Sequence, residues 1–310
     1  MPDYAYFNGQ FVPLAEAKVG IMTHALNYGT ACFEGIRGNW NAEDNTMYLF
    51  RIEDHFRRLH RSCHVMRIGL PYSVDELCQL TLELVKRNSC EEDVYVRPLA
   101  YKSAQAVGVR LHNLEDGFFM FLTPFGPYLD LEKGARCCVS TWRRIDDNTI
   151  PPRAKVTGLY VNSAMAKTEA WENGFDEAIL LNQDGRVSEG SGENIFLVSE
   201  GSLLTPPPSD NILVGITRDT IIELAKMELG IDTVERSISR TELYSADECF
   251  LTGTAAHVAP VVEIDRRAIG DGRVGQTTKQ LQQLYFSIVR GREAKYAAWC
   301  SPVQYTEAAA

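Results

Sequence analysis

Residues 188–194 place two acids, Glu189 and Glu193, on either side of a Gly-Ser-Gly sequence. Because this spacing cannot form a helix face, we expect the segment to join two strands, the second of them the apolar run 195–198. The glycines permit another group to approach the backbone closely, and acids at strand ends can point inward. A glycine-rich turn with exposed acids is equally consistent with this segment alone.

Short strands and helices follow one another without a repeat, which predicts an α+β fold. Asn8-Gly9 between two apolar triplets predicts a type I′ hairpin. Apolar residues at helical spacing predict a helix over 53–66, and the capping box from Ser73 to Glu76 opens a second helix. Further strands are predicted at 94–101, 118–123, 135–142, 178–181, 186–188, 195–198, 203–204, 248–251 and 258–262, and further helices at 159–173, 217–229 and 277–290.

At about 150 residues per domain, a chain of 310 residues is expected to form two domains. Prolines and glycines without strand or helix period place an interdomain linker at 125–134. This division predicts a small N-terminal domain at 1–124 and a larger domain at 135–310. The last twenty residues have weak periodicity and are expected to form a loose tail.

The net charge of −10 argues against nucleic acid as the main partner. No apolar stretch approaches the roughly 18 residues of a membrane span, and the first residues do not resemble a signal peptide. Eight cysteines without Cys-x-x-Cys pairs suggest buried thiols in a reducing cytoplasm. His60 and His64 are one helical turn apart, but neighbouring arginines would repel a cation, so we expect no metal.

Three further features suit a small anionic ligand. Residues 214–219 precede an apolar helix, where Thr217 or a neighbour can cap a helix N-terminus that attracts anions. Residues 251–256 end a strand in small residues whose N–H and hydroxyl groups can converge. Lys155 lies among small or apolar neighbours, where desolvation favours a neutral, nucleophilic amine. Each of these features is weak by itself, because every capped helix looks like this and an exposed lysine is the commoner case. Together with the acids of residues 188–194, they match the needs of pyridoxal phosphate.

Several ordered motifs make the chain resemble the class IV (fold-type IV) pyridoxal-phosphate aminotransferases, and among them the branched-chain amino acid aminotransferases. The resemblance extends from about residue 6 to about residue 291. The motifs that carry it are His24-Ala25-Leu26-Asn27-Tyr28-Gly29, Phe33-Glu34-Gly35-Ile36-Arg37, Arg58-Leu59-His60, Tyr95-Val96-Arg97-Pro98, Asn148-Thr149-Ile150-Pro151, Lys155 with Tyr160, residues 188–194, Gly215-Ile216-Thr217-Arg218-Asp219 and Gly253-Thr254-Ala255-Ala256. A two-domain fold is implied, with a small α/β domain and a larger domain that contains a barrel-like sheet.

The resemblance implies that Lys155 carries the cofactor as an imine and moves a proton between the substrate Cα and the cofactor. Glu189 is implied as the partner of the ring nitrogen, with Glu193 the weaker candidate, and Arg58 as a bidentate partner of the phosphate. The cofactor-binding residues implied in this way are Arg58, Lys155, Tyr160, Glu189, Leu213, Ile216, Thr217 and Thr254.

The substrate is expected to meet Tyr95 and Arg97, which project to the same side of a strand because they are two residues apart. The loop Val107-Gly108-Val109 is implied to cover the pocket of a partner subunit, so that the chain forms a homodimer or a higher homo-oligomer. Arg110 is an added cation, facing either solvent or the second carboxylate of 2-oxoglutarate. The implied substrate-binding residues are Tyr28, Phe33, Gly35, Tyr95, Arg97, Val109, Arg110, Ala255 and Ala256.

The implied reaction is a ping-pong transfer of the amino group from leucine, isoleucine or valine to 2-oxoglutarate, through a lysine aldimine. The small-molecule partners are then amino acids and 2-oxo acids. A D-amino acid aminotransferase or an (R)-selective amine transaminase on the same fold is the main alternative. An aminodeoxychorismate lyase is weaker, because the expected pocket walls are apolar.

Overall fold

The computed structural model describes residues 2–305, which form two compact units. The first unit comprises Met1–Gly126, Ala154–Gly158 and Ser287–Ala310, and the second comprises Pro127–Arg153 and Leu159–Phe286. The predicted linker 125–134 contains the point at which the chain first passes between units. The predicted C-terminal domain, however, includes 154–158 and 287–305, which lie in the first unit. No helix of the described part of the chain is long and apolar enough to cross a membrane.

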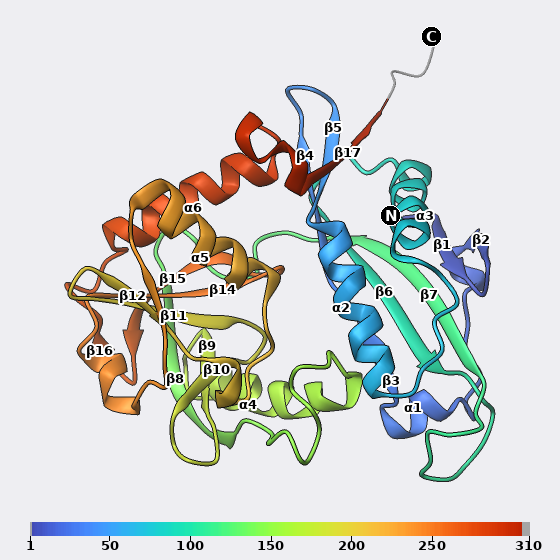
Figure 1. The fold of residues 1–310 in the computed structure, drawn as a ribbon, viewed down its shortest axis with the longest axis horizontal. Helices are drawn as coiled ribbons and strands as arrows, with labels where there is room; N and C mark the ends of the chain where they lie inside the picture. The colour runs from blue at the N-terminus through green and yellow to red at the C-terminus, as the bar shows by residue number, and fades with distance from the viewer. Residues whose placement is uncertain (1, 306–310) are drawn as a thin grey trace. The chain divides into compact units, whose positions relative to one another are not determined.

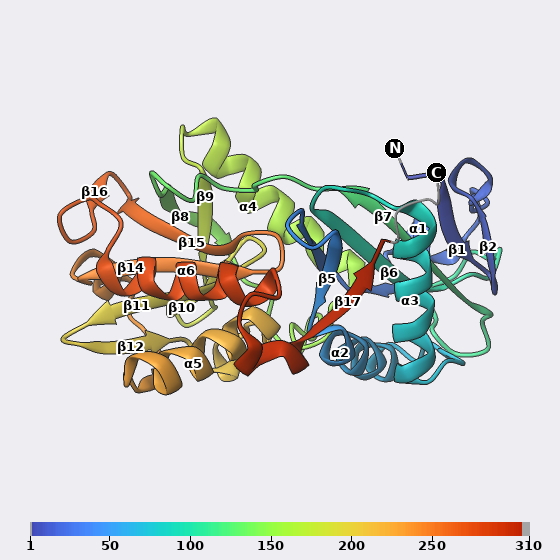
Figure 2. The ribbon, with the colours of Figure 1, turned by 90° about the horizontal axis from the view of Figure 1, so that it is seen from above.

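The first unit contains an antiparallel sheet that has eight strands among the described residues, in the order β17-β5-β4-β6-β7-β1-β2, with β3 paired to β6 (Figure 1). The strands are β1 (Tyr4–Phe7), β2 (Gln10–Pro13), β3 (Ala31–Phe33), β4 (Ile36–Asn41), β5 (Thr46–Phe50), β6 (Val94–Lys102), β7 (Asp116–Pro124) and β17 (Cys300–Gln304). Its helices are α1 (His24–Tyr28), α2 (Ile52–Val65) and α3 (Val74–Asn88), of which α2 and α3 pack against each other (Figure 2).

Two local predictions in this unit are confirmed in detail. Asn8 and Gly9 both adopt positive φ, 48° and 89°, as a type I′ turn requires, and they join β1 to β2. Ser73 and Glu76 form the predicted capping box at the start of α3, where the Glu76 N–H donates to Ser73 Oγ over 3.2 Å. These elements were predictable because each depends on residues a few positions apart.

The expected loose tail is wrong for the residues before 306. A short 3₁₀ helix, Ala294–Trp299, leads into β17, which pairs antiparallel with β5 from Cys300 opposite Phe50 to Gln304 opposite Thr46. Because the partner strand lies near the beginning of the chain, no local pattern around residue 300 could reveal the pairing. Residues 306–310 lie outside the described part.

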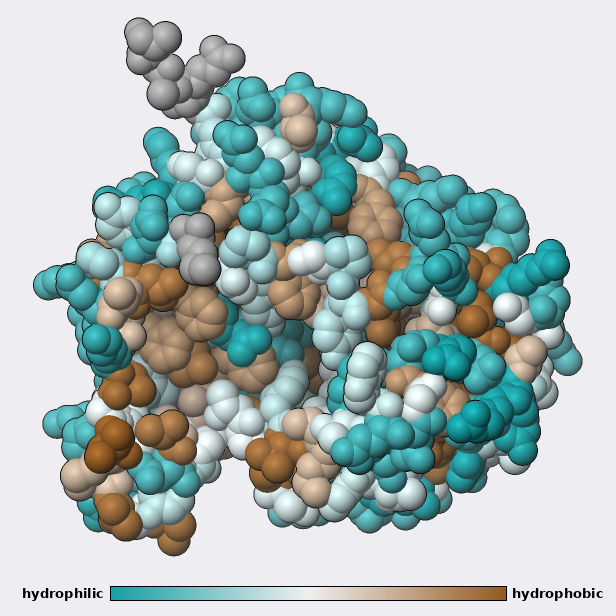
Figure 3. Space-filling view, turned by 180° about the vertical axis from the view of Figure 1, so that it is seen from behind, coloured by the Kyte–Doolittle hydropathy of each residue, from teal (hydrophilic) through white to brown (hydrophobic). Residues whose placement is uncertain are grey.

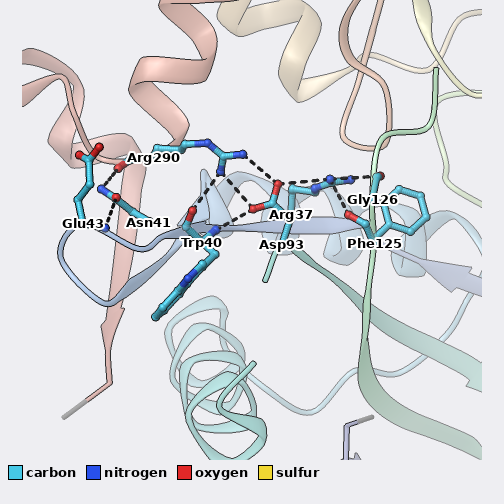
Figure 4. A network of polar contacts seen from close by, with 8 residues as sticks. All are labelled: Arg37, Trp40, Asn41, Glu43, Asp93, Phe125, Gly126 and Arg290. Atoms are coloured by element: carbon cyan, nitrogen blue, oxygen red, sulfur yellow. Dashed lines mark hydrogen bonds and ion pairs between the residues drawn. The ribbon is translucent and has the colours of Figure 1, made fainter. Parts of the chain in front are cut away.

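A polar network holds the two segments at which the first unit continues into the second (Figure 4). The buried guanidinium of Arg37 donates to the carbonyl oxygens of Phe125 and Gly126 over 2.7 and 3.4 Å, and it lies 3.6 Å from Asp93. Arg290 pairs with the same aspartate at 3.1 Å. One carboxylate therefore links strand β4 to the chain near 126 and near 290.

The second unit contains a sheet with nine described strands in the order β10-β9-β8-β15-β14-β11-β12-β13, with β16 paired to β15. The strands are β8 (Ala135–Arg143), β9 (Glu177–Leu181), β10 (Val187–Gly190), β11 (Asn194–Ser199), β12 (Ser202–Thr205), β13 (Thr233–Glu235), β14 (Glu248–Gly253), β15 (His257–Ile264) and β16 (Arg267–Ala268). The helices are α4 (Tyr160–Glu172), α5 (Ile216–Leu229) and α6 (Gln276–Val289), the last of which ends in the first unit. Further 3₁₀ turns are Leu14–Glu16, Thr157–Leu159, Pro208–Asp210 and Arg240–Tyr244.

Strand β9 shows how this sheet is covered on both faces. Ala178 and Leu180 pack in a cluster with Ala166 and Ala170 of α4. Their neighbours Ile179 and Leu181 point to the other face, because successive side chains of a strand alternate, and join the main core there. The mixture of helices with largely antiparallel sheets confirms the predicted α+β class.

Candidate active site

Lys155 lies in segment 154–158 of the first unit, which is part of the predicted C-terminal domain 135–310. Its carbonyl oxygen accepts a hydrogen bond from Phe33 N over 3.0 Å, and its N–H donates to Ser62 Oγ over 3.1 Å. The amine nitrogen Nζ lies 4.8 Å from the centroid of the Phe33 ring. Burial, assisted by the charge of Arg58, lowers the pKa of Lys155 to about 8. The main chain is thus fixed from two elements, and the amine gives up its proton readily.

Arg58 of α2 forms a bidentate ion pair with the fully buried Glu34. Arg58 Nε and Nη2 lie 2.7 and 2.8 Å from Glu34 Oε1 and Oε2. Burial alone would raise the pKa of Glu34, but the charge of Arg58 outweighs it and holds that pKa well below its usual range. His55 Nδ1 lies 2.7 Å from the same carboxylate. Glu34 therefore occupies the edge of the guanidinium formed by Nε and Nη2, and the bidentate pairing of Arg58 with phosphate stays a prediction.

Tyr95 and Arg97 project to the same side of β6, as the spacing predicted. Arg97 Nη2 donates to the Tyr95 hydroxyl over 3.2 Å, and the guanidinium lies 4.4 Å from the centre of the Phe33 ring. The Cβ of any side chain at Gly35 would lie only 1.9 Å from the Tyr95 hydroxyl, so glycine at this position lets the tyrosine keep its place. These four residues and Lys155 form one cluster in the first unit.

The loop between β6 and β7 is tied to α1. His24, which is buried, lies with Nε2 2.8 Å from the Gly108 carbonyl oxygen and with Nδ1 2.8 Å from Thr30 Oγ1. Gly108 N donates to the Tyr28 hydroxyl over 3.0 Å. Val109, by contrast, is 89% exposed. Tyr28 and Val109 are predicted site residues. His24 is not, although it is the first residue of one of the motifs that carry the resemblance.

The carboxylate of Glu189, in the second unit, is held by an ion pair and two hydrogen bonds. Its Oε1 lies 2.6 Å from Arg144 Nη2 in a buried ion pair. Its Oε2 accepts hydrogen bonds from Asn194 Nδ2 and from the main-chain N–H of Leu213, each over 3.0 Å. Arg144 did not figure in the sequence analysis, because it lies far from residues 188–194 along the chain. Leu213 contacts this acid through its main-chain N–H.

Glu193 is also buried but has different neighbours. Its Oε2 accepts a hydrogen bond from Gly192 N over 3.1 Å. Burial and the negative charge of Glu177 raise the pKa of Glu193 to about 8. The nearby cation, Lys167, forms its ion pair with Glu177 at 2.6 Å. Segment 188–194 was consistent with either exposed or buried acids. The structure shows that both Glu189 and Glu193 are buried.

The N-terminus of α5 is an anion site by geometry. The helix has 14 residues, its N-cap is Gly215, and no side chain forms a capping hydrogen bond there. Of the predicted capping candidates, Thr217 or a neighbour, the N-cap is the neighbour Gly215, because the helix begins at Ile216. A Cβ at Gly215 would lie 2.1 Å from Asn194 Oδ1, so the backbone comes close to the residue that supports Glu189.

The structure sorts the predicted residues between the two units. The first unit contains Tyr28, Phe33, Gly35, Arg58, Tyr95, Arg97, Val109, Arg110 and Lys155, and the second contains Tyr160, Glu189, Leu213, Ile216, Thr217, Thr254, Ala255 and Ala256. Thr254, Ala255 and Ala256 form the turn between β14 and β15. The second unit thus offers a buried carboxylate for a protonated ring nitrogen and an uncapped helix N-terminus for a phosphate. This donor set fits pyridoxal phosphate.

The fold and these residues define a protein of the pyridoxal-phosphate aminotransferase type. Residues 31–264 match the model of the family described as amino-transferase class IV, and the chain belongs to this family. It is 51% identical over 301 residues to the probable branched-chain-amino-acid aminotransferase of Aquifex aeolicus, with 97% of each chain covered.

Solved structures of similar proteins agree with this assignment. The branched-chain aminotransferase of Thermoproteus uzoniensis, solved with norvaline, superposes with a TM-score of 0.93 at 44% identity, covering 98% of this chain and all of that one. The branched-chain amino acid aminotransferase of Thermobaculum terrenum, solved in its PLP form, gives 0.94 at 40% identity over 98% of this chain and 99% of that one. The predicted family and fold type are therefore confirmed.

Proposed function

We propose that this chain transfers the amino group of branched-chain L-amino acids to 2-oxoglutarate, with pyridoxal 5′-phosphate as cofactor. Identities of 40–51% over nearly the whole chain confirm the predicted enzyme class, activity and cofactor. The single structural observation that carries the proposal is Lys155, whose main chain is fixed by Phe33 and Ser62 and whose amine has its pKa lowered to about 8. Such an amine is neutral often enough to attack a carbonyl near neutral pH.

Pyridoxal phosphate, when bound, supplies a reactive aldehyde and a ring that takes up the electron pair left when the substrate Cα loses its proton. In our proposal Lys155 Nζ holds that proton and moves it between the substrate Cα and the cofactor carbon C4′. The Glu189 carboxylate would accept a hydrogen bond from the ring nitrogen, and the Tyr160 hydroxyl would bind the ring oxygen. The main-chain N–H groups of Ile216 and Thr217, at the start of α5, would bind the phosphate.

Arg58 and Thr254 complete the proposed phosphate contacts. Because Glu34 occupies Nε and Nη2 of Arg58, this arginine would act through the opposite edge of its guanidinium. Glu34 then serves to orient the arginine and to balance its charge in a buried setting.

The proposed substrate site uses the first-unit cluster. Arg97 presents a cation held by Phe33 and Tyr95, which suits a carboxylate, and its buried Nε has no hydrogen-bond partner among the described residues. The amides of Ala255 and Ala256 are proposed to help receive the carboxylate. Phe33 and Gly35 contribute an apolar wall, which distinguishes aliphatic side chains by only about 1–3 kcal/mol per methylene. Leucine, isoleucine and valine are therefore expected to overlap as substrates.

A second copy of the chain is the proposed macromolecular partner. Large apolar side chains of the first unit are exposed around α1 and the loop between β6 and β7, and apolar residues gather at this end of the unit (lower left in Figure 3). They are Ile21 (86%), Met22 (50%), Leu26 (63%), Val107 (81%) and Val109 (89%). An exposed apolar patch of this kind favours association. Sedimentation of the holoenzyme tests this, and a monomer at all concentrations would contradict it. Cytoplasmic location remains a prediction.

The decisive experiment uses purified protein loaded with cofactor. Borohydride treatment followed by peptide mass spectrometry is expected to place the reduced cofactor on Lys155. L-leucine is expected to bleach the yellow colour, and 2-oxoglutarate to restore it. A label on another residue would overturn the assignment of Lys155. Bleaching by D-alanine or an (R)-amine but not by L-leucine would favour the alternative activities instead.

A further inference from the structure

Arg144 is a buried arginine to which neither the motifs nor the proposed contacts assign a role. It follows the last residue of β8, and its side chain is 4% exposed. Nη2 lies 2.6 Å from Glu189 Oε1, whereas Nε makes only a long contact, 3.4 Å, with the Asn211 carbonyl oxygen. Nη1 is buried without a hydrogen-bond partner among the described residues. The guanidinium is therefore committed to Glu189 by its ion pair.

This arrangement is costly if its only purpose is to hold the fold together. Taking two charges out of water is repaid only when their remaining donors and acceptors are well paired. Glu189 meets that condition through Asn194 and the Leu213 N–H, but Arg144 does not, since Nη1 has no partner within residues 2–305. A neutral donor would bury Glu189 at lower cost. The presence of a full positive charge points to an electrostatic task.

Glu193 is a buried acid close to Glu189 that, in the described part of the chain, has no such ion pair with an arginine, and its pKa shows the effect of that difference. Burial and Glu177 raise the pKa of Glu193 to about 8, so this group is largely protonated near neutral pH. A neutral carboxylic acid cannot hold a ring nitrogen in its protonated, cationic form. Glu189 therefore needs a nearby cation if it is to stay ionised while buried.

We infer that Arg144 is a positioning residue, which keeps the Glu189 carboxylate ionised and aimed, and so keeps the proton on the cofactor ring nitrogen. The inference rests on the proposed function, since it concerns the same cofactor. With the cofactor bound, the proton between Glu189 and the cofactor ring would be bonded either to a carboxylate oxygen or to the ring nitrogen. Arg144 lies directly against the carboxylate, so its charge favours the ionised acid and the protonated ring.

The test compares four variants, three at Arg144 and one at Arg143, with the unaltered holoenzyme. Arg144→Met and Arg144→Gln remove the charge, and the second of them keeps a hydrogen-bond donor. Arg143→Met is the matched control, because it removes the neighbouring arginine, whose side chain is exposed. Each protein is loaded with pyridoxal phosphate that carries an isotope label at the ring nitrogen. Nuclear magnetic resonance then reports whether that nitrogen is protonated, with the free cofactor in acid and in base as the two reference points.

The unaltered protein and Arg143→Met are expected to show a protonated ring nitrogen. Both Arg144 variants are expected to shift the resonance toward the neutral reference, and kcat for L-leucine is expected to fall on the order of 100-fold. Arg144→Lys, which restores a charge without the planar fork, should bring the resonance part of the way back. A role confined to folding would leave the resonance in place in any variant that folds.

Two results overturn the inference while leaving the proposed function intact. One is an unshifted resonance in a folded Arg144→Met or Arg144→Gln protein. The other is a neutral ring nitrogen in the unaltered holoenzyme, which decides the question even if neither variant folds. Failure of the unaltered protein to attach the cofactor to Lys155 would instead overturn the proposed function.

Discussion

Glu189 and Glu193 lie at the two ends of one Gly-Ser-Gly segment, and both are buried, yet their electrostatic surroundings are opposite. Glu189 forms an ion pair with Arg144 and accepts two further hydrogen bonds. Glu193 faces Glu177, whose cation, Lys167, is already engaged. The comparison teaches that burial does not decide what a carboxyl group can do. The charge placed beside it does, because that charge selects which protonation state the interior accepts.

Glu189→Gln is expected to give the largest effect. It removes the negative charge proposed to face the ring nitrogen while keeping the shape of the side chain, so kcat for L-leucine should fall about 100-fold or more. Steady-state kinetics with cofactor in excess measure this. Glu193→Gln is the matched control, since it neutralises the other acid of the segment. Equal losses in the two variants would erase the proposed distinction between them.

Glu34→Gln tests a second arginine-paired acid, in the first unit. The change leaves the buried Arg58 without its partner charge, and unfolding free energy should fall by about 3–5 kcal/mol. Urea unfolding of the apoprotein measures the loss. Glu53→Gln is a suitable control, because the ion pair of Glu53 with Arg57 is more than half exposed and should contribute at most about 1 kcal/mol.

The pH dependence of the Glu34 pair has a definite sign. The pKa of Glu34 is lowered on folding, so the pair stabilises the protein above the ordinary range of a glutamate and loses this contribution as the pH falls toward the lowered value. The difference between the unaltered protein and Glu34→Gln should therefore shrink in acid. A difference that grows on acidification would contradict the assigned protonation state.

Glu193→Gln should change the pH dependence of stability in the opposite direction from Glu34→Gln, and by a smaller amount. Folding raises the pKa of Glu193 to about 8, so the folded state binds a proton more tightly than the unfolded state. The contribution of Glu193 to stability is then fully present below its ordinary pKa and is lost as the pH rises through about 8. Relative to the unaltered protein, the variant should gain on the order of 1 kcal/mol or more between about pH 5 and about pH 8. Unfolding curves measured at the two pH values give the change in unfolding free energy for each protein. An equal change in the variant and in the unaltered protein would refute this.

Arg110→Ala extends the comparison from paired to exposed charges and should have the smallest effect. Arg110 is exposed, next to Val109, and is proposed to attract the second carboxylate of 2-oxoglutarate. An exposed cation contributes at most about 1 kcal/mol, so KM for 2-oxoglutarate should rise by only a few-fold. KM for a monocarboxylate keto acid should stay unchanged. Equal changes in KM for both acceptors would show that Arg110 does not bind the second carboxylate and faces solvent instead.

Much of the local structure could be predicted because neighbouring residues specify it. The Asn8-Gly9 hairpin, the Ser73 capping box and the strand that follows Asn194 all depend on residues within one turn or one strand. The motifs also identified Lys155 and Glu189 as candidates. They did not identify Arg144 or Glu34, although Glu34 lies inside a motif, because a motif gives residue types in order and not the side chain that faces them.

The amino-acid order alone therefore determined the family, the α+β class and the residue types available for chemistry near Lys155 and in segment 188–194. Only the tertiary structure decided that Arg58 faces Glu34, that Arg144 rather than Lys167 stands beside Glu189, and that β17 completes the sheet along β5. Each of these pairings joins residues far apart in the chain. No periodicity reports them, since a pKa or a strand register depends on distances in space that only the folded backbone sets.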